Sequence, residues 1–283
     1  MAAAREPERV IHSNLGLRVG TFRCPVQHPE FRTAGPIEGY TIAFPRSAVW
    51  IQPEGHRPFV ADPGVVTIYN LGQRYVRLPL SAEGDRCDWF SVSRETAHAI
   101  AAGLVPDTDP ARPFPVSFAR TTGAAYYRQR RLFARIVGGG MDPFEVEQEV
   151  VLLIGTVLEA ALGCGPKHAG ARSRRNHDVA EHARAELARN PLERHSIREI
   201  AQRVGVSPFH LCRVFRRYTG MTQHHYLLEL RTRLALERFG AGDTSLSRLA
   251  LELGFSSHSH FTAAFRARLG FPPSRARREL SRP

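Results

Sequence analysis

The chain has 283 residues, 42% of them hydrophobic, which is enough for two domains with ordinary cores, and no run of about 18 apolar residues occurs that could span a membrane. The formal net charge of +12 lies entirely in residues 163–283, which carry 22 Lys and Arg against 10 Asp and Glu, whereas residues 1–162 hold 17 of each sign. This asymmetry predicts a neutral domain followed by one that faces a polyanion.

Residues 15–93 have the pattern of short β-strands. Segments 39–44, 48–51 and 65–69 are rich in β-branched and aromatic residues, and Pro, Gly or Asp residues bound them. Many short strands at regular spacing predict a barrel or a sandwich.

Two helices are predicted after the strands, over residues 124–137 and 143–162. The second begins with a capping residue, Asp142, followed by Pro143 at the first helical position. Its apolar residues recur at alternating steps of four and three, at Val146, Val150, Leu153, Val157 and Ala160. This seam fits two interpretations: packing against its own domain, or a homodimer contact through the helix at 143–162.

Residues 163–176 are polar, basic and rich in Gly and Ala, so we expect a linker there. The predicted domains are therefore 1–162 and 177–283. The predicted fold class is α+β, with an N-terminal β-barrel and its two helices followed by an all-α domain.

The C-terminal part repeats itself. Residues 196–207 are echoed by residues 245–256 at an offset of 49, and each copy continues into a second helix that ends in Phe and is followed by Gly. Each copy therefore contains a helix, a glycine turn, a second helix and a closing glycine in the same order, which is strong internal evidence for duplicated structure.

Local signals in the first copy predict a helix-turn-helix. Ser196 and Glu199 have the spacing of a capping box, Gly205 suits a tight turn, and Ser207-Pro208 is a typical helix start. The inward side of the second helix is then formed by Leu211, Val214 and Phe215. Such a unit, with arginines on its outer face, fits a major groove roughly 12 Å wide.

Two such units joined by a helix at about 222–239 resemble the AraC/XylS family of regulators over residues 177–283. The residues that carry the resemblance are Gly254-Phe255-Ser256-Ser257, Phe261, Phe265-Arg266 and Gly270-Phe271-Pro272-Pro273. The resemblance implies that the strand-rich half is a cupin-like sensing and dimerisation domain.

The resemblance also implies which residues contact base edges. In the first unit these are Phe209, Cys212 and Arg213, and in the second they are His258, Ser259 and Thr262. A guanidinium at Arg213 can bond guanine O6 and N7 together. The second unit has Ala263 where the family often has a long polar side chain, and Ala276-Arg277 where it tends to have Tyr-Arg, so we expect it to read bases less than the first.

Phosphate contacts are expected from residues that flank the base-reading positions: Ser207, Arg216, Arg217, Ser257, His260 and Arg266. The alternative for the arginines is an ordinary solvated face, but the concentration of positive charge in this half favours phosphate contact. His258 and His260 have a metal-like spacing, yet residues two apart on a helix do not share a face, so no metal is predicted.

The sequence argues against an enzyme. The histidines of the first domain are scattered: His12, His28, His56 and His98. The cysteines are also far apart: Cys24, Cys87, Cys164 and Cys212. This spacing suits neither a metal cluster nor a disulfide framework, and it fits a reducing compartment. No Gly-x-Ser-x-Gly, P-loop or dinucleotide motif occurs, so we predict no catalysis and no cofactor in a cytoplasmic protein.

The predicted function is sequence-specific transcription regulation on double-stranded DNA, with a small-molecule effector bound by the first domain and RNA polymerase as a possible partner. The alternative is a constitutive DNA-binding protein whose barrel serves only dimerisation or partner recruitment. The first domain has four residues of the kinds that line pockets: Tyr40, Trp50, His56 and Tyr69. Core packing explains each of them equally well, so the sequence assigns no ligand site.

Overall fold

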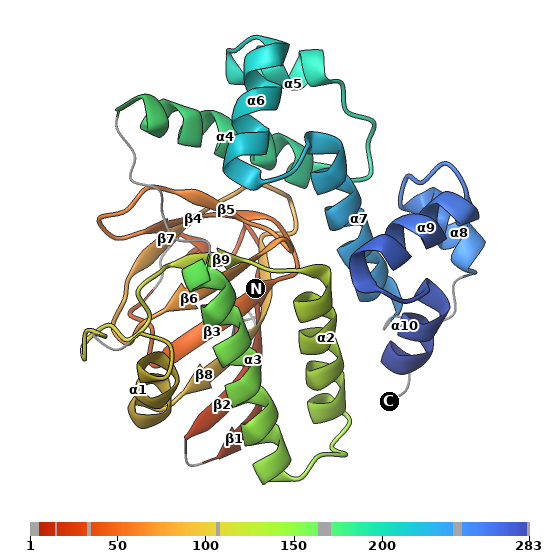
Figure 1. Cartoon of the computed structure of the whole chain (residues 1–283). Helices are drawn as coiled ribbons and strands as arrows, with labels where there is room; N and C mark the ends of the chain where they lie inside the picture. Colours follow the sequence, from red (N-terminus) through yellow and green to blue (C-terminus); the bar gives the residue numbers. More distant parts are fainter. Residues whose placement is uncertain are drawn as a thin grey trace. The chain divides into compact units, whose positions relative to one another are not determined.

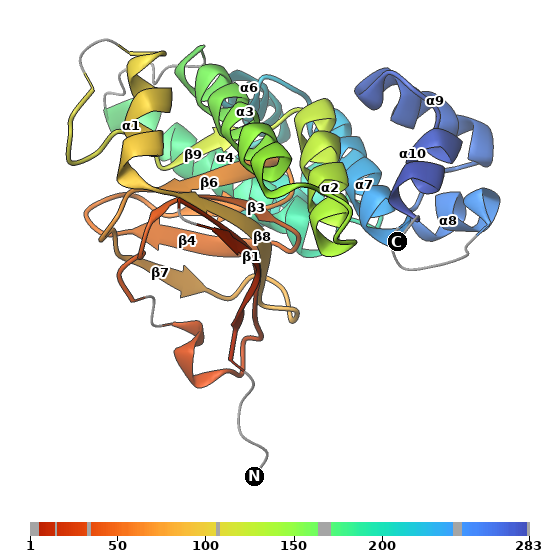
Figure 2. The same cartoon turned by 90° about the horizontal axis from the view of Figure 1, so that it is seen from below.

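The protein is described by a computed structural model that covers residues 6–14, 16–32, 35–105, 108–163, 171–239 and 245–281. The chain divides into two compact units, Met1–Gly165 and Pro166–Arg282 (Figures 1 and 2). Most of the predicted linker, residues 164–170, lies outside the described residues, and helix α4 (Ala171–Arg189) already begins within its last part. In the described ranges, no helix is both long and apolar enough to cross a membrane.

The N-terminal unit consists of antiparallel strands in two sheets. The six-stranded sheet has the order β1-β2-β8-β3-β6-β9, and the three-stranded sheet has the order β5-β4-β7. The strands are β1 (Glu8–Asn14), β2 (Leu17–Cys24), β3 (Tyr40–Pro45), β4 (Val49–Pro53), β5 (Phe59–Ala61), β6 (Val65–Tyr69), β7 (Tyr75–Leu78), β8 (Asp85–Val92) and β9 (Phe118–Arg120).

The strand-rich architecture is confirmed, but the predicted closed barrel is wrong. Among the described strands, the large sheet ends at β1 on one side and at the three-residue β9 on the other, and these two edges do not pair with each other. The result is two sheets facing one another. Strand spacing indicates how many strands form but not which edges meet, because edge pairing depends on contacts between distant segments.

Period-two alternation gives the large sheet two apolar faces. Val19, Ile42 and Phe90 lie on one face, which is covered by α1 (Arg94–Ala102), α2 (Gly123–Val137) and α3 (Pro143–Gly163), as Figure 2 shows. The opposite face looks toward β4, β5 and β7. Phe90 and Phe133 of α2 make an edge-on ring contact with centroids 6.4 Å apart. The sheet is therefore buried on both sides.

The apolar seam of α3 packs against its own unit. Val146, Val150, Leu153 and Val157 are all buried there, whereas Ala160 is exposed. Of the two interpretations of this seam, packing within the domain therefore accounts for four of its five residues. The outward side of α3 still carries large apolar residues, since Phe144 is 74% and Leu152 is 48% exposed.

The C-terminal unit is helical. After α4 come α5 (Ile197–Val204), α6 (Pro208–Thr219), α7 (Gln223–Phe239), α8 (Leu246–Glu252), α9 (His258–Leu269) and α10 (Pro273–Leu280). The sequence repeat is a structural repeat. Leu211 and Phe215 of α6 are buried, and Phe261 and Phe265 are buried at the equivalent positions of α9.

Glycines in left-handed conformation form the turns that were predicted. Gly205 follows α5 with φ of 71°, and Gly254 precedes α9 with φ of 75°. Ser207 caps α6, and its Oγ accepts from the N–H of His210 at 3.2 Å. In the second copy the cap is Ser257, because that turn contains one residue more. The predicted capping box at Ser196 is not formed, since the Ser196 side chain makes no capping hydrogen bond.

Candidate nucleic-acid interface

Helix α6 presents a mixed aromatic and basic face to solvent. Its apolar side is buried as predicted, while Phe209 on the other side is 76% exposed. Arg213 is exposed one turn further on, and its Cζ lies 6.0 Å from the centre of the Phe209 ring. Cys212 beside it is half-buried. An exposed arginine supported by an aromatic ring is well suited to reach a base edge.

Helix α9 presents a smaller and less basic face at the equivalent positions. His258 and Ser259 are exposed, and Ala263 is exposed where α6 has Arg213. Thr262 is half-buried and its Oγ1 is inaccessible to solvent, so its outward part is the methyl group. At the position where α6 carries the guanidinium of Arg213, this face carries only the methyl group of Ala263.

The expected phosphate contacts lie at the edges of these two helices. Arg216, Arg217 and Arg266 are exposed, as are the capping residues Ser207 and Ser257. Exposed serines at helix N-termini leave backbone N–H groups near the surface, where they can meet phosphate oxygens.

His260 differs from the other expected phosphate contacts because it is less exposed. It is half-buried, its Nδ1 lies 3.0 Å from the Oγ of Ser256, and its ring is 5.5 Å from that of Phe255. These contacts hold the imidazole against the turn that precedes α9.

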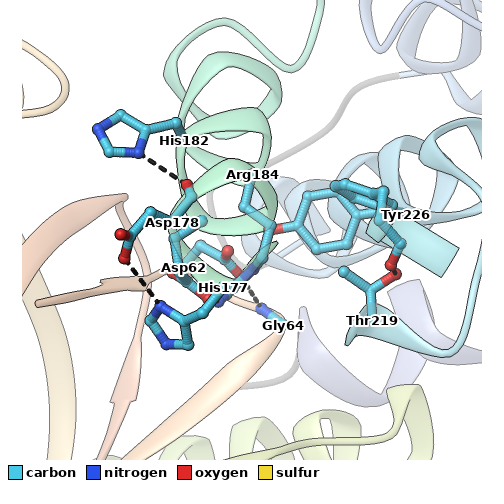
Figure 3. A network of polar contacts seen from close by, with 10 residues as sticks. Asp62, Gly64, His177, Asp178, His182, Arg184, Thr219 and Tyr226 are labelled. Atoms are coloured by element: carbon cyan, nitrogen blue, oxygen red, sulfur yellow. Dashed lines mark hydrogen bonds and ion pairs between the residues drawn. The ribbon is translucent and has the colours of Figure 1, made fainter. Parts of the chain in front are cut away.

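A buried polar contact joins α4 to α7, and a ring contact continues from it to α6; Figure 3 shows Arg184 and Tyr226. Arg184 of α4 is 1% exposed, its Nε donates to the Tyr226 hydroxyl at 3.2 Å, and its Nη1 donates to Glu181 at 2.7 Å. The Tyr226 ring in turn contacts Phe215 edge-on, with centroids 5.5 Å apart. The equivalent position in the second copy is Ala276, which is fully buried. Alanine cannot make the hydrogen bond that Tyr226 makes with Arg184, so the second unit lacks this contact at the equivalent position.

The N-terminal unit contains a second polar cluster that sequence reasoning missed. Arg77 of β7 is 3% exposed, and its guanidinium donates to the carbonyls of Glu30 and Phe31 and to the Tyr75 hydroxyl. It also lies 3.7 Å from Asp85 of β8. These groups lie between the two sheets. Strand alternation could have indicated this cluster, because Arg77 and Asp85 both stand at inward positions of their strands.

Burial in this cluster disfavours the ionised forms of its acidic side chains. Burial raises the pKa of Asp85 to about 6, although Arg77 opposes the shift, and burial also raises the pKa values of Tyr69, Tyr75 and Cys87. The indole Nε1 of Trp89, which lies in the same inter-sheet core, is buried and makes no hydrogen bond.

The four residues that the sequence singled out as pocket types do not gather at one place. Tyr69 lies between the sheets, but Tyr40 packs against His98 and Phe114 on the helix-covered face. Trp50 is half-buried and His56 is exposed. Only Tyr69 of these four therefore lies in the inter-sheet core.

Comparison with known proteins bears on the helical unit. Residues 200–279 match the helix-turn-helix domain family. The HTH-type transcriptional regulator ArgR of Pseudomonas aeruginosa is 37% identical over 81 residues, which cover 29% of this chain and 25% of ArgR. The probable transcription factor PqrA of Proteus vulgaris is 31% identical over 106 residues, which cover 38% of this chain and 85% of PqrA.

A solved structure is also similar to part of this chain. The transcriptional regulator of Chromobacterium violaceum that is described as having an AraC-type DNA-binding domain is 31% identical, with 40% of this chain and 99% of that chain covered and a TM-score of 0.36. The chain spans about a quarter of the length of ArgR. With PqrA matched over 85% of its length at 31% identity, with residues 200–279 matched to the helix-turn-helix domain family, and with the duplicated helix-turn-helix in place, the chain belongs to the AraC/XylS family of transcriptional regulators.

Proposed function

We propose that this protein is a sequence-specific transcription regulator that reads DNA mainly through α6 and binds phosphates around α6 and α9. The observation that carries the proposal is the exposed pair of Phe209 and Arg213 on a helix whose other side is fully packed. An exposed phenyl ring costs solubility without contributing to the core, so its place on the outer face of a recognition helix supports contact with a partner.

The asymmetry of the two helices supports an asymmetric reader. Arg213 can bond two acceptors of a guanine, whereas Ala263 can offer only a methyl contact, for example to thymine. We therefore propose base contacts by Phe209, Cys212 and Arg213, and weaker ones by His258, Ser259 and Thr262. Phosphate contacts are proposed for the flanking residues Ser207, Arg216, Arg217, Ser257, His260 and Arg266.

The test begins with selection of bound sequences from a random DNA pool by the full-length protein. Binding of wild type and of Arg213→Ala is then measured on the selected site and on random duplex. We expect Arg213→Ala to lose roughly 10- to 100-fold affinity for the selected site but little for random duplex, because one bidentate base contact contributes about 1–3 kcal/mol of discrimination.

Arg217→Ala, on the same helix, is the matched control and should weaken binding to both DNAs alike. If Arg213→Ala also weakens both alike, Arg213 contacts phosphate and the assignment of α6 as the base reader is wrong.

We further propose that the N-terminal unit senses a small molecule in its inter-sheet core. The support is a set of polar groups in a place where apolar packing would be more stable: Arg77, Asp85, Tyr75, Tyr69 and the indole N–H of Trp89. Such groups among aromatic rings are typical of binding sites for small polar compounds. A constitutive DNA-binding protein remains the competing function.

A metabolite screen on the full-length protein distinguishes these two functions. The two tryptophans, Trp50 and Trp89, both lie in the N-terminal unit, so their fluorescence reports its unfolding. A compound that raises the temperature of this unfolding transition and also changes the affinity for DNA supports sensing. If no compound raises this temperature, and the protein binds DNA with full affinity without any compound, the constitutive function is favoured.

The outward side of α3 is our proposed dimer contact. Phe144 and Leu152 are exposed there and are two helical turns apart. Sedimentation of wild type and of Phe144→Ser/Leu152→Ser should show a dimer that the double variant loses. A wild-type monomer at micromolar concentration would exclude this contact.

A further inference from the structure

Arg231 of α7 bonds through one side chain both to the segment that leads into the first helix-turn-helix unit and to the turn of the second unit. Its Nε donates to the Pro191 carbonyl at 2.8 Å, and its Nη2 donates to the Glu193 carbonyl at 2.9 Å. Both acceptors belong to the segment that leads from α4 into α5. On the other side, its Nη1 donates to the carbonyl of Gly254 at 2.6 Å, in the turn between α8 and α9.

The chemistry of this contact requires a guanidinium. Its planar fork offers five N–H groups in fixed directions, so it can bond carbonyls on two sides without bending. A lysine ammonium is a point charge and cannot span the same acceptors. Arg231 is only 8% exposed, and burial lowers its pKa because loss of solvent disfavours the charged guanidinium.

Gly254 is shaped to receive this side chain. A Cβ at Gly254 would lie 2.9 Å from the Cζ of Arg231, and the φ of 75° already favours glycine there. The turn of the second unit is thus closed directly over the guanidinium. Any side chain at this position would push the turn and the arginine apart.

The repeat shows that Arg231 is not needed to build either copy. At the 49-residue offset, Arg184 of α4 corresponds to Arg233 of α7, and both are buried inside their own copies. Arg231 corresponds instead to His182, which is exposed on α4. The contact is therefore an addition made where the two copies are joined, at the helix that runs from one group of helices to the other (Figure 1).

We propose that Arg231 is a positioning residue that fixes the angle and the separation of the two helix-turn-helix units, and thereby the spacing of the two DNA segments that the protein binds. The inference rests on the proposed function, because it concerns how α6 and α9 engage one duplex. Two rigidly joined units bind tightly only at matching spacing, whereas a loosened pair tolerates several spacings with lower peak affinity.

The experiment uses full-length protein and the site selected by the wild type. Footprinting first locates the segments protected by each unit, and affinities are then measured for this site, for each segment alone, and for sites with one or two base pairs inserted between the segments. We expect the insertions to lower the affinity of the wild type roughly tenfold, but to lower the affinity of Arg231→Met and Arg231→Lys only about twofold. The affinity of both variants for single segments should stay near that of the wild type.

The matched control is Arg238→Met, an exposed arginine on the same helix, whose side chain is 57% accessible. It should keep the wild-type spacing preference. A purely structural role for Arg231 would lower the thermal stability and the affinity for single segments while leaving the spacing penalty intact, and that result would overturn the proposal.

The two failures are distinguishable. If the wild type selects no DNA sequence, the proposed function is wrong, and this inference, which rests on it, is wrong as well. If the wild type protects two segments and the Arg231 variants keep its spacing penalty, only the inference is wrong.

Discussion

At the scale of single residues, Tyr226 has a role that its position in the sequence does not reveal. Its hydroxyl accepts from the Nε of Arg184 in an environment almost without solvent. Loss of one partner from a buried hydrogen bond costs about 1–3 kcal/mol when a charged group is left short of an acceptor. This bond therefore contributes to holding α4 and α7 around α6.

We expect Tyr226→Phe to lower the free energy of unfolding of the helical unit by about 1–3 kcal/mol, because the ring stays and only the acceptor is lost. Helical circular dichroism in a urea titration measures this change. The reciprocal variant Arg184→Met should not add the full cost again in the double mutant, since both residues share one bond. Full additivity would show that the two side chains act independently.

Asp85 makes the N-terminal unit sensitive to pH. Burial raises its pKa from 3.8 to about 6 in the folded protein, so the folded state holds the proton more tightly than the unfolded state does. The contribution to stability is therefore complete below the unfolded value and is lost as the pH rises through the folded value.

We expect wild type to gain up to roughly 3 kcal/mol relative to Asp85→Asn between about pH 7 and about pH 4, because Asn resembles the protonated acid at every pH. Tryptophan fluorescence in urea titrations at several pH values measures the difference for this unit alone. A wild-type-to-variant difference that is flat with pH would show that folding does not shift the pKa of Asp85.

At the scale of elements, the first turns of α6 and α9 combine a structural and a binding role. Ser207 and Ser257 both cap their helices through Oγ, with bonds of 3.2 and 3.0 Å, and both are exposed on the proposed DNA side. A helix cap and a phosphate contact require different side chains. Aspartate is a good helix cap, but its negative charge repels phosphate.

We therefore expect Ser207→Ala to lower stability by about 1 kcal/mol, and Ser207→Asp to keep stability while DNA affinity falls. Thermal unfolding and binding to random duplex, measured on the same preparations, give the two quantities. Ser196→Asp is the control at the first turn of α5. If Ser207→Asp binds DNA like wild type, the start of α6 faces away from the phosphates.

At the scale of the whole molecule, charge is divided between the two units. Residues 163–283 carry the entire excess of +12, and the arginines proposed to contact phosphate lie on the exposed edges of two helices. Binding that neutralises phosphates releases counter-ions, so the logarithm of the binding constant falls linearly with the logarithm of salt concentration.

We expect Arg217→Gln and Arg266→Gln each to reduce the magnitude of this salt slope by about 0.9, with nearly equal effects on selected and random DNA. Arg248→Gln is the control, because Arg248 is exposed but pairs with Glu252 at 2.8 Å on α8. An unchanged slope in both test variants would place these arginines on a solvated face.

Sequence by itself determined the duplicated helix-turn-helix and its inward residues. The reason is that its signals are local: Gly205 selects the turn, Ser207 and Pro208 start the helix, and Leu211 and Phe215 define the packed side. It also determined the strand content of the first half, since period-two alternation is a property of a few neighbouring residues.

Only the tertiary structure decided which sheet edges meet, which polar side chains share an interior, and how the two helix-turn-helix units are joined. Arg77 and Asp85 come from different sheets, and Arg231 reaches carbonyls at Pro191 and Gly254 on either side of it in the chain. These contacts involve groups far apart in sequence. They are stable because the polar groups are removed from solvent together and hydrogen-bond to one another in the interior. That condition is met only after the whole domain has folded.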